Sequence, residues 1–299
     1  MPKVIIAKAA NGDNVSLSGQ SLNDHLTAGN GLQFLYGTGG NDTLIGGNGT
    51  QELYGGSEND SITGGAGNQT LAGGAGDDRL FGGSGNQCLY GGSGVDYIVV
   101  GNGNQTLEGG AGFDVLDFSQ LNGKIEIDQD LHTATLNDAI TGAVLFNYSL
   151  QSFDSVIGTS GADTIWGAEF TPRTYNGGDG DDKFYSESGG DVVYGGAGAD
   201  EFRWYKKYVA VNHTDEIKDF QVGTDHLDLA DFLKGQYTAG GVYINSPTYT
   251  QVTQLVATFD GVGNAATLVK ALGGDGVYHD VVVLDGVVAS SVTIADLVL

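Results

Sequence analysis

A nine-residue repeat runs from residue 19 to residue 117 and constrains the fold of this 299-residue chain more than any other feature. Its unit is Gly-Gly-x-Gly-x-(Asp or Gln)-x-(Leu or Ile)-x, as residues 73–81, GGAGDDRLF, illustrate. The eighth position is apolar in every unit: Leu26, Leu35, Leu44, Leu53, Ile62, Leu71, Leu80, Leu89, Ile98, Leu107 and Leu116. Such a period predicts a stack of short strands joined by turns in which glycine supplies the left-handed backbone.

The sixth position of the unit alternates between two side chains. It is aspartate at Asp24, Asp42, Asp60, Asp78, Asp96 and Asp114, and glutamine at Gln33, Gln51, Gln69, Gln87 and Gln105. The full period is therefore 18 residues, and successive units fall on opposite sheets of a coil. Units 18 residues apart stack at about 4.8 Å within one sheet. We expect positions seven to nine to form a strand with position eight inward, the aspartates along one side and the glutamines along the other.

The aspartate side has the chemistry of a calcium site. Calcium takes six to eight oxygen ligands at about 2.3–2.6 Å, and glycine-rich turns can direct carbonyl oxygens inward beside a carboxylate. Five gaps between stacked turns result: 24/42, 42/60, 60/78, 78/96 and 96/114. A metal-free Asx-turn is the better explanation of one isolated unit, but six stacked carboxylates repel one another unless cations separate them. The gap at 24/42 is weakened by Gln20–Leu22 in the turn, and that beside Asp60 by Glu58 in place of glycine.

The glutamine side calls for a different interpretation. Amides stacked at the spacing of neighbouring strands can hydrogen-bond to one another as a ladder, so we expect a metal-free amide ladder there. Tyr36, Tyr54 and Tyr90 share an outward column on this side, interrupted by Ala72. Such a column could bind sugars, but stacking between neighbouring strands is the simpler explanation.

Repeat units return at 158–203 after an interruption. Asp163, Asp182, Asp191 and Asp200 occupy the sixth position there, and an irregular unit lies near Pro172. The spacing places Asp163, Asp182 and Asp200 on one side and Asp191 on the other, with gaps at 163/182 and 182/200.

The remaining segments complete an all-β organisation. We expect an N-terminal cap at 1–18, a first β-roll at 19–117, a β insertion at 118–157, a second β-roll at 158–203 and a C-terminal β-rich cap and secretion region at 204–299. Within the insertion, residues 124–128, 133–136 and 143–148 have the composition of longer strands separated by Asn, Asp and Gly turns.

The repeat resembles the RTX (repeats-in-toxin) calcium-binding nonapeptide. That resemblance implies a parallel β-roll of two stacked sheets with Ca²⁺ ions between turns, held by Asp24, Asp42, Asp60, Asp78, Asp96, Asp114, Asp163, Asp182, Asp191 and Asp200. Residues 215–229 resemble the cap that follows RTX repeats in secreted proteases and epimerases. The end of the chain, 294–299, resembles the uncleaved signal of type I secretion substrates, which implies export by that apparatus to the extracellular space.

Charge and motif content narrow the function. The formal net charge is −25 with only 12 Lys and Arg, which argues against nucleic acid as a partner because phosphate binding needs a basic surface. Residues 1–11 lack the apolar core of a cleaved signal peptide, no run is long enough for a transmembrane helix, and Cys88 is the single cysteine. Neither HExxH, GxSxG nor a P-loop occurs. The many Asp and Glu residues include candidates for the carboxylate pair of a glycoside hydrolase. Nothing in the sequence places such a pair in a cleft, so we expect that the protein is not an enzyme.

Three functions are compatible with this pattern. The leading one is a secreted calcium-binding protein that acts in adhesion, matrix or exopolysaccharide association, or host interaction. The layout also resembles the nodulation-associated secreted calcium-binding proteins of rhizobia, which implies signalling through cation-permeable pores in host membranes. A third possibility, implied by resemblance to the RTX modules of alginate epimerases, is an accessory module for uronate polysaccharides. In all three, acidity and 52 glycines oppose folding until calcium binds.

Overall fold

The computed structural model describes part of the chain. The described residues are 6–8, 15–167, 172–186, 190–204, 214–228, 236–237, 243–244, 252–259, 265–272, 278–287, 291 and 297–298. They form two compact units, one of Met1–Gly123 with His132–Ile157 and the other of Lys124–Leu131 with Gly158–Leu299. The fold is all-β, as predicted. No helix in the described part of the chain has the length and apolar character that a membrane span needs.

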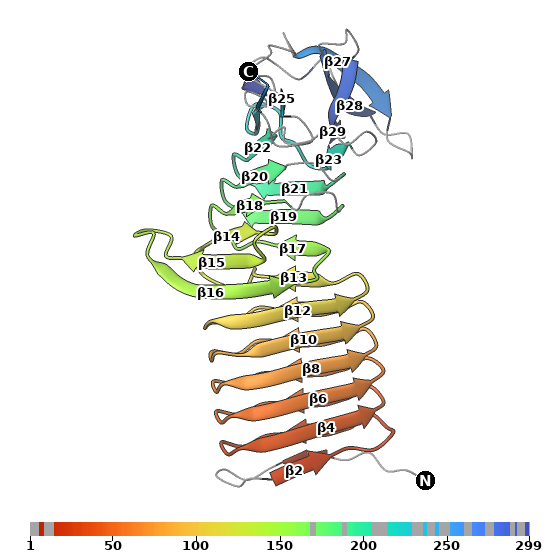
Figure 1. Ribbon diagram of the computed structural model, residues 1–299, viewed down its shortest axis with the longest axis vertical. Coiled ribbons are helices and arrows are strands. Elements are labelled where there is room, and N and C mark those ends of the chain that lie inside the picture. The colour runs from red at the N-terminus through yellow and green to blue at the C-terminus, as the bar shows by residue number, and fades with distance from the viewer. Residues whose placement is uncertain are drawn as a thin grey trace. The chain divides into compact units, whose positions relative to one another are not determined.

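The first unit is a coil of two parallel sheets, and the chain alternates between them (Figure 1). The first sheet contains β1 (Ile6–Lys8), β3 (His25–Thr27), β5 (Thr43–Ile45), β7 (Ser61–Thr63), β9 (Arg79–Phe81), β11 (Tyr97–Val99), β13 (Val115–Asp117) and β17 (Ser155–Ile157). The second contains β2 (Val15–Ser18), β4 (Gln33–Gly39), β6 (Gln51–Ser57), β8 (Gln69–Ala75), β10 (Cys88–Ser93), β12 (Gln105–Ala111) and β16 (Val144–Gln151), with β15 (Thr133–Asn137) antiparallel to β16. Within the repeat block, from β2 to β13, strands pair with an offset of 18 residues, as Leu35 with Leu53 shows.

The eighth repeat position forms the core of this coil. All eleven of its Leu and Ile side chains, from Leu26 to Leu116, have no exposed surface. Their neighbours at positions seven and nine are mostly half-buried or exposed, as the pattern of β5 and β7 shows. The predicted inward column is therefore confirmed.

Strand length differs between the two sheets, which the repeat alone does not predict. Strands that follow an aspartate have the expected three residues, as in β5 and β7. Those of the glutamine units are mostly longer and run into the next glycine pair, as in β6. The extension exists because the glycines keep pairing with the next strand, Gly56 with Gly74, at a positive φ of 121° and 119° that L side chains avoid.

The segment 118–157 supplies strands to both units. Its predicted strands are present as β14 (Lys124–Asp128), β15 and β16. Within the first unit, β16 pairs with β12 and β17 pairs with β13, both in parallel. Within the second unit, β14 pairs in parallel with β18 (Thr164–Trp166).

The second unit has the same two-sheet plan. One sheet has the order β14-β18-β20-β22-β24-β30, and the other has the order β19-β21-β23-β29-β28-β27. The further strands are β19 (Thr174–Asp179), β20 (Lys183–Ser186), β21 (Val192–Ala197), β22 (Glu201–Trp204), β23 (Asp215–Ile217), β24 (His226–Asp228), β27 (Val252–Phe259), β28 (Ala265–Leu272), β29 (Tyr278–Asp285) and β30 (Leu297–Val298). A separate antiparallel pair joins β25 (Gln236–Tyr237) to β26 (Tyr243–Ile244).

Aromatic packing fills part of the second core. The rings of Phe184 and Phe202 stack with centroids 5.3 Å apart, and Phe220 packs against Phe202. Within the predicted secretion signal at 294–299, only 297–298 belong to the described residues, and there they form β30.

Candidate metal centre

The six aspartates of the first repeat block form one continuous column in the first unit. We call the turns that end at them, and lead into the first sheet, the Asp edge. Each side chain is at most 3% exposed. In the five from Asp42 to Asp114, one carboxylate oxygen, Oδ1, accepts a hydrogen bond from the backbone N–H of the aspartate 18 residues earlier, at 2.7 Å from Asp42 to Asp60 and from Asp60 to Asp78. This bond fixes each carboxylate in the gap between two turns.

The second oxygen of five of these carboxylates has no hydrogen-bond partner among the described residues. In Asp42, Asp60, Asp78, Asp96 and Asp114, Oδ2 is buried without a hydrogen bond. A buried carboxylate oxygen of this kind is costly unless a cation compensates it. Five such oxygens in one column indicate a repeated cation site.

Glycine creates the space beside each orphaned oxygen. A Cβ on Gly73 would collide with Asp78 Oδ2 and with the carbonyl oxygen of Gly91 in the next turn. The same crowding recurs at Gly37, Gly55 and Gly91. At each gap, therefore, a carboxylate oxygen and a backbone carbonyl oxygen from the neighbouring turn converge on one spot that only a glycine turn leaves open.

Burial and mutual repulsion raise the pKa of these carboxyl groups. Desolvation is the largest cause, and neighbouring aspartates add to it, while the backbone hydrogen bond acts in the opposite direction. The pKa of Asp60 rises to about 7, and those of Asp78 and Asp96 rise to about 6. Burial also raises the pKa of Asp42 and Asp114. Without a cation, the ionised column opposes folding at neutral pH.

The donor set at the Asp edge suits calcium. Calcium prefers carboxylate and carbonyl oxygens, whereas zinc prefers nitrogen and sulfur ligands. Among the described residues, no group of three or more His, Cys, Asp or Glu side chains gathers at one point. An ion at this edge would thus be held by single aspartates from stacked turns together with backbone carbonyls, as the glycine geometry allows.

Both ends of the column differ from its middle. Asp24 Oδ2 accepts a hydrogen bond from Gln20 N–H at 2.6 Å, so the non-glycine turn already satisfies this oxygen, in keeping with the expected weakness of the first gap. At the other end, Asp154 Oδ2 accepts from Asp114 N–H at 3.0 Å and extends the column. Asp154 is not among the aspartates that the repeat predicts, because no Gly-Gly-x-Gly turn precedes it. Its signal is the sequence Asp154-Ser155-Val156, which matches positions six to eight.

A second column lies in the second unit. Asp163, Asp182 and Asp200 lead into β18, β20 and β22, and Asp182 and Asp200 each have an orphaned Oδ2. Desolvation raises the pKa of Asp182 to about 8, and those of Asp163 and Asp200 to about 6. Asp163 differs, because Thr159 N–H donates to its Oδ2 at 2.5 Å. Asp225 continues the column by accepting from Asp200 N–H at 3.1 Å.

Asp191 lies before β21, on the other sheet of this unit, as its spacing predicts. Its Oδ1 accepts from Arg173 N–H at 2.9 Å, and Asp191 N–H donates to Asp215 at 2.8 Å. Burial and the charge of Asp215 raise the pKa of Asp191 to about 7, while Arg173 lowers it. The charge of Arg173 offsets only part of this rise. A metal-binding role for Asp191 stays a prediction.

The stretch after the second repeat block closes the last glycine turn. Asp219 accepts hydrogen bonds from the N–H groups of Gly195 and Gly196, at 2.8 and 3.0 Å. The Gln221 amide donates to the Gly196 carbonyl at 2.8 Å. Residues of the predicted cap thereby form hydrogen bonds with backbone groups of the last glycine turn, in the place of a further repeat.

The opposite turns of the first unit, which we call the Gln edge, have no such orphaned groups in the glutamine side chains. Gln69 illustrates the pattern: its Oε1 accepts from Gly65 N–H at 2.8 Å, and its Nε2 donates to Gly47 O at 2.6 Å and to Gln51 Oε1 at 2.6 Å. Gln87 repeats the bond to the turn at 2.9 Å and reaches Gln69 Oε1 at 3.4 Å. The amide hydrogens thus contact turn carbonyls at positions where the Asp edge presents a carboxylate. The absence of metal at the Gln edge stays a prediction.

Stacking explains the Tyr36 and Tyr54 part of the outward tyrosine column. The rings of Tyr36 and Tyr54 lie 5.2 Å apart and within 5° of parallel. Their facing surfaces cover one another, which leaves no open ring face between them for a sugar. The simpler of the two interpretations is the one that the geometry supports.

Two family descriptions match the chain. Residues 105–299, well over half of the sequence, match the C-terminal domain of the M10 serralysin peptidases. Four copies of the RTX calcium-binding nonapeptide repeat match residues 18–50, 27–62, 54–86 and 63–98. No curated protein sequence matches the chain significantly.

Solved structures resemble parts of the chain. The AlgE6R3 subunit of the Azotobacter vinelandii mannuronan C5-epimerase shares 23% identity over 48% of this chain and 77% of its own length, with a TM-score of 0.36. The extracellular lipase LipA from Serratia marcescens shares 18% identity over 84% of this chain and 40% of its own length, with a TM-score of 0.23.

Proposed function

Because the chain belongs to the RTX proteins that carry a serralysin-type C-terminal domain, we propose that it folds on extracellular calcium and then acts, without catalysis, in polysaccharide or matrix association. RTX nonapeptide repeats bind Ca²⁺ ions. A serralysin-type C-terminal domain accompanies type I secretion to the extracellular space. The coarse function is therefore that of a secreted calcium-binding protein, and the finer role is our proposal.

One observation carries the proposal: the row of buried, unpartnered Oδ2 atoms in both units. In a chain of net charge −25, each such carboxylate opposes folding until a cation binds between the turns. The free energy of calcium binding then becomes free energy of folding. Low calcium inside the cell would keep the chain unfolded for export, and high calcium outside would fold it.

A calcium titration tests this proposal. Far-UV circular dichroism of the full chain should change from a largely unfolded to a β-rich spectrum as calcium is added, and return when a chelator is added. Magnesium at the same concentration is the control, because its small, rigid octahedral shell fits poorly between turns. A β-rich spectrum that persists in chelator at neutral pH would contradict the proposal.

The absence of catalysis is tested separately. RTX repeats and serralysin C-terminal domains are non-catalytic modules, so we expect no turnover of alginate or other uronate polymers by the calcium-loaded protein. Release of unsaturated products, or a changed uronate composition, would assign an enzyme instead. Calcium-dependent leakage of liposomes would support the pore-forming alternative.

A further inference from the structure

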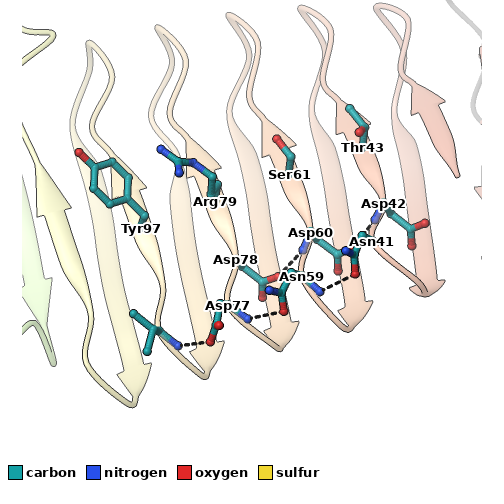
Figure 2. Close-up of a pocket in the computed structure, with 11 residues that line it drawn as sticks. Asn41, Asp42, Thr43, Asn59, Asp60, Ser61, Asp77, Asp78, Arg79 and Tyr97 are labelled. Carbon is teal, nitrogen blue, oxygen red and sulfur yellow. Dashed lines mark hydrogen bonds between the residues drawn. The ribbon is translucent and has the colours of Figure 1, made fainter. Parts of the chain in front are cut away.

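A polar groove of about 560 Å³ lies along the outer surface of the first unit beside the Asp edge (Figure 2). Residues from four successive turns line it. Asp42, Asp60 and Asp78 of the aspartate column contribute to the lining but are each at most 3% exposed, and two more accessible rows complete it. One row holds Thr43, Ser61, Arg79 and Tyr97, and the other holds Asn41, Asn59 and Asp77. Val95, whose N–H donates to Asp77, follows Asp77 in the second row. Four turns at about 4.8 Å spacing give the groove a length of about 14 Å.

The asparagine row is held in a fixed orientation. Asn41 Oδ1 accepts from Asn59 N–H at 3.2 Å, and Asn59 Oδ1 accepts from Asp77 N–H at 2.9 Å. Because the oxygens are bound to the backbone, the Nδ2 groups of Asn41 and Asn59 are left as donors, and they find no hydrogen-bond acceptor among the described residues. Side-chain donors therefore lie on two successive turns, and Asp77 and Val95 continue the row without one.

Arg79 introduces a positive charge into the other row. It is the single Lys or Arg between residues 9 and 123. Its guanidinium lies over the ring of Tyr97, 4.9 Å from the centroid, and Tyr97 Oη donates to Asp117 at 2.6 Å. No carboxylate of the described residues lies within ion-pair distance of Arg79, although the chain is strongly acidic. The guanidinium is thus exposed, oriented and available to an external anion.

We infer that this groove binds a strand of anionic polysaccharide, an inference that rests on the proposed function. Amides, hydroxyls and the exposed carboxylate of Asp77 along an open groove can exchange hydrogen bonds with the many hydroxyls of a sugar chain, while the carboxylates of Asp42, Asp60 and Asp78 are buried in the aspartate column. The regular spacing suits a polymer with a repeating unit about the length of a pyranose ring. Arg79 selects a carboxylate or sulfate on that unit, and Tyr97 orients the guanidinium.

Binding of the calcium-loaded full chain to defined polymers tests the inference. Isothermal titration calorimetry would use polyuronate oligosaccharides, a sulfated glycan, neutral dextran and poly-L-glutamate. Arg79→Gln should weaken binding of the anionic glycan by about 10- to 100-fold, the range expected for one lost charge-assisted contact. Lys183→Gln, which removes an exposed positive charge elsewhere, should leave binding unchanged.

The asparagine row has its own matched pair. Asn59→Asp keeps the oxygen that holds Asp77 N–H but replaces the donor with a negative charge, so it should weaken binding at least about tenfold. Asn86 forms the same kind of ladder bond, to Asn104 at 3.2 Å, on the Gln edge. Asn86→Asp adds the same charge away from the groove and should have no effect.

Several results would overturn the inference. These are no binding of any anionic glycan by the wild-type protein, equal binding of dextran, binding of poly-L-glutamate as tight as that of the glycans, or full affinity in Arg79→Gln and Asn59→Asp. A preference for carboxylated over sulfated glycan, or the reverse, identifies the anion and supports the groove. Circular dichroism of the same samples in calcium separates a lost groove from a lost fold, so failure here is distinguishable from failure of the proposed function.

Discussion

Replacing one aspartate of the column should have opposite effects with and without calcium. Asp78 is the best position, because it stands between two gaps and is 1% exposed. In Asp78→Asn the amide oxygen can still accept the hydrogen bond from Asp60 N–H, so the turn keeps its backbone contact. What changes is Oδ2, the orphaned atom, which becomes an uncharged donor.

The size of each effect follows from the site. In calcium, one lost charged ligand costs about 1.5–3 kcal/mol, and Asp78 faces two gaps, so folding should lose about 3–6 kcal/mol and up to two bound ions. Without calcium, the rise in the pKa of Asp78 from 3.8 to about 6 corresponds to at most about 3 kcal/mol against the ionised fold at pH 7.5. Solvent screening at the open groove beside the Asp edge reduces this destabilisation to about 1–2 kcal/mol. Asp78→Asn should raise the stability of the calcium-free protein by that amount.

Asp77→Asn is the matched control. Asp77 is the neighbouring residue, is exposed, and uses Oδ1 to accept from Val95 N–H at 2.8 Å, a bond that asparagine retains. Calorimetric calcium stoichiometry and urea unfolding, each in calcium and in calcium-free buffer, would be compared for both variants. Unchanged stoichiometry in Asp78→Asn, or an equal loss in Asp77→Asn, would refute the assignment of the column as the calcium site.

Three further predictions follow from the same geometry. Gly73→Ala should abolish calcium binding at its gap, because the new Cβ would collide with Asp78 Oδ2 and a carbonyl oxygen. The control Gly142→Ala has no atom within 4 Å of the new Cβ and should lower stability by only about 1–2 kcal/mol, because of its left-handed backbone. Calcium stoichiometry and thermal unfolding would be measured for both variants, and an equal stoichiometry would contradict the prediction. Gln69→Ala should lower stability by about 2–3 kcal/mol, since it leaves turn groups unpaired, with calcium stoichiometry unchanged; a lost ion would place metal at the Gln edge. In calcium-free buffer, the pKa values of Asp60 and Asp182 are raised to about 7 and about 8. The stability that these two protonated carboxyl groups contribute is therefore fully present below about pH 4 and is lost as the pH rises through 7 to 8. Circular dichroism should show more β structure at pH 5 than at pH 8, and the reverse order would be inconsistent with a buried, calcium-free column.

Much of this architecture is determined locally and could be predicted from the repeat. Each nine-residue unit contributes one strand and one inward apolar side chain to the core, and all eleven of these side chains are buried. The 18-residue alternation placed the aspartates of each block in a column, and the observed hydrogen bonds join residues 18 apart, as from Asp60 to Asp78. The resemblance to RTX repeats is supported by the family descriptions that match the chain.

Other features depend on tertiary pairing that no local pattern encodes. Asp154 stands 40 residues after Asp114, and only the parallel pairing of β17 with β13 brings the two together. Asp225 likewise joins its column through the pairing of β24 with β22, 25 residues from Asp200. The long glutamine-unit strands arise because paired glycines continue the sheet, which depends on the neighbouring turn and not on strand propensity.

The unequal outer faces of the first unit have a consequence for how the chain finds its alignment. Its interior is degenerate: sliding a strand by 18 residues would again place leucine on leucine and aspartate on aspartate. The outward pairs are not interchangeable, since Tyr36 stacks on Tyr54, and Arg79 lies over Tyr97. A slipped alignment keeps the core and the carboxylate column but separates these partners. The outward residues thereby determine which strand pairs with which, while the buried residues determine only that each repeat forms a strand.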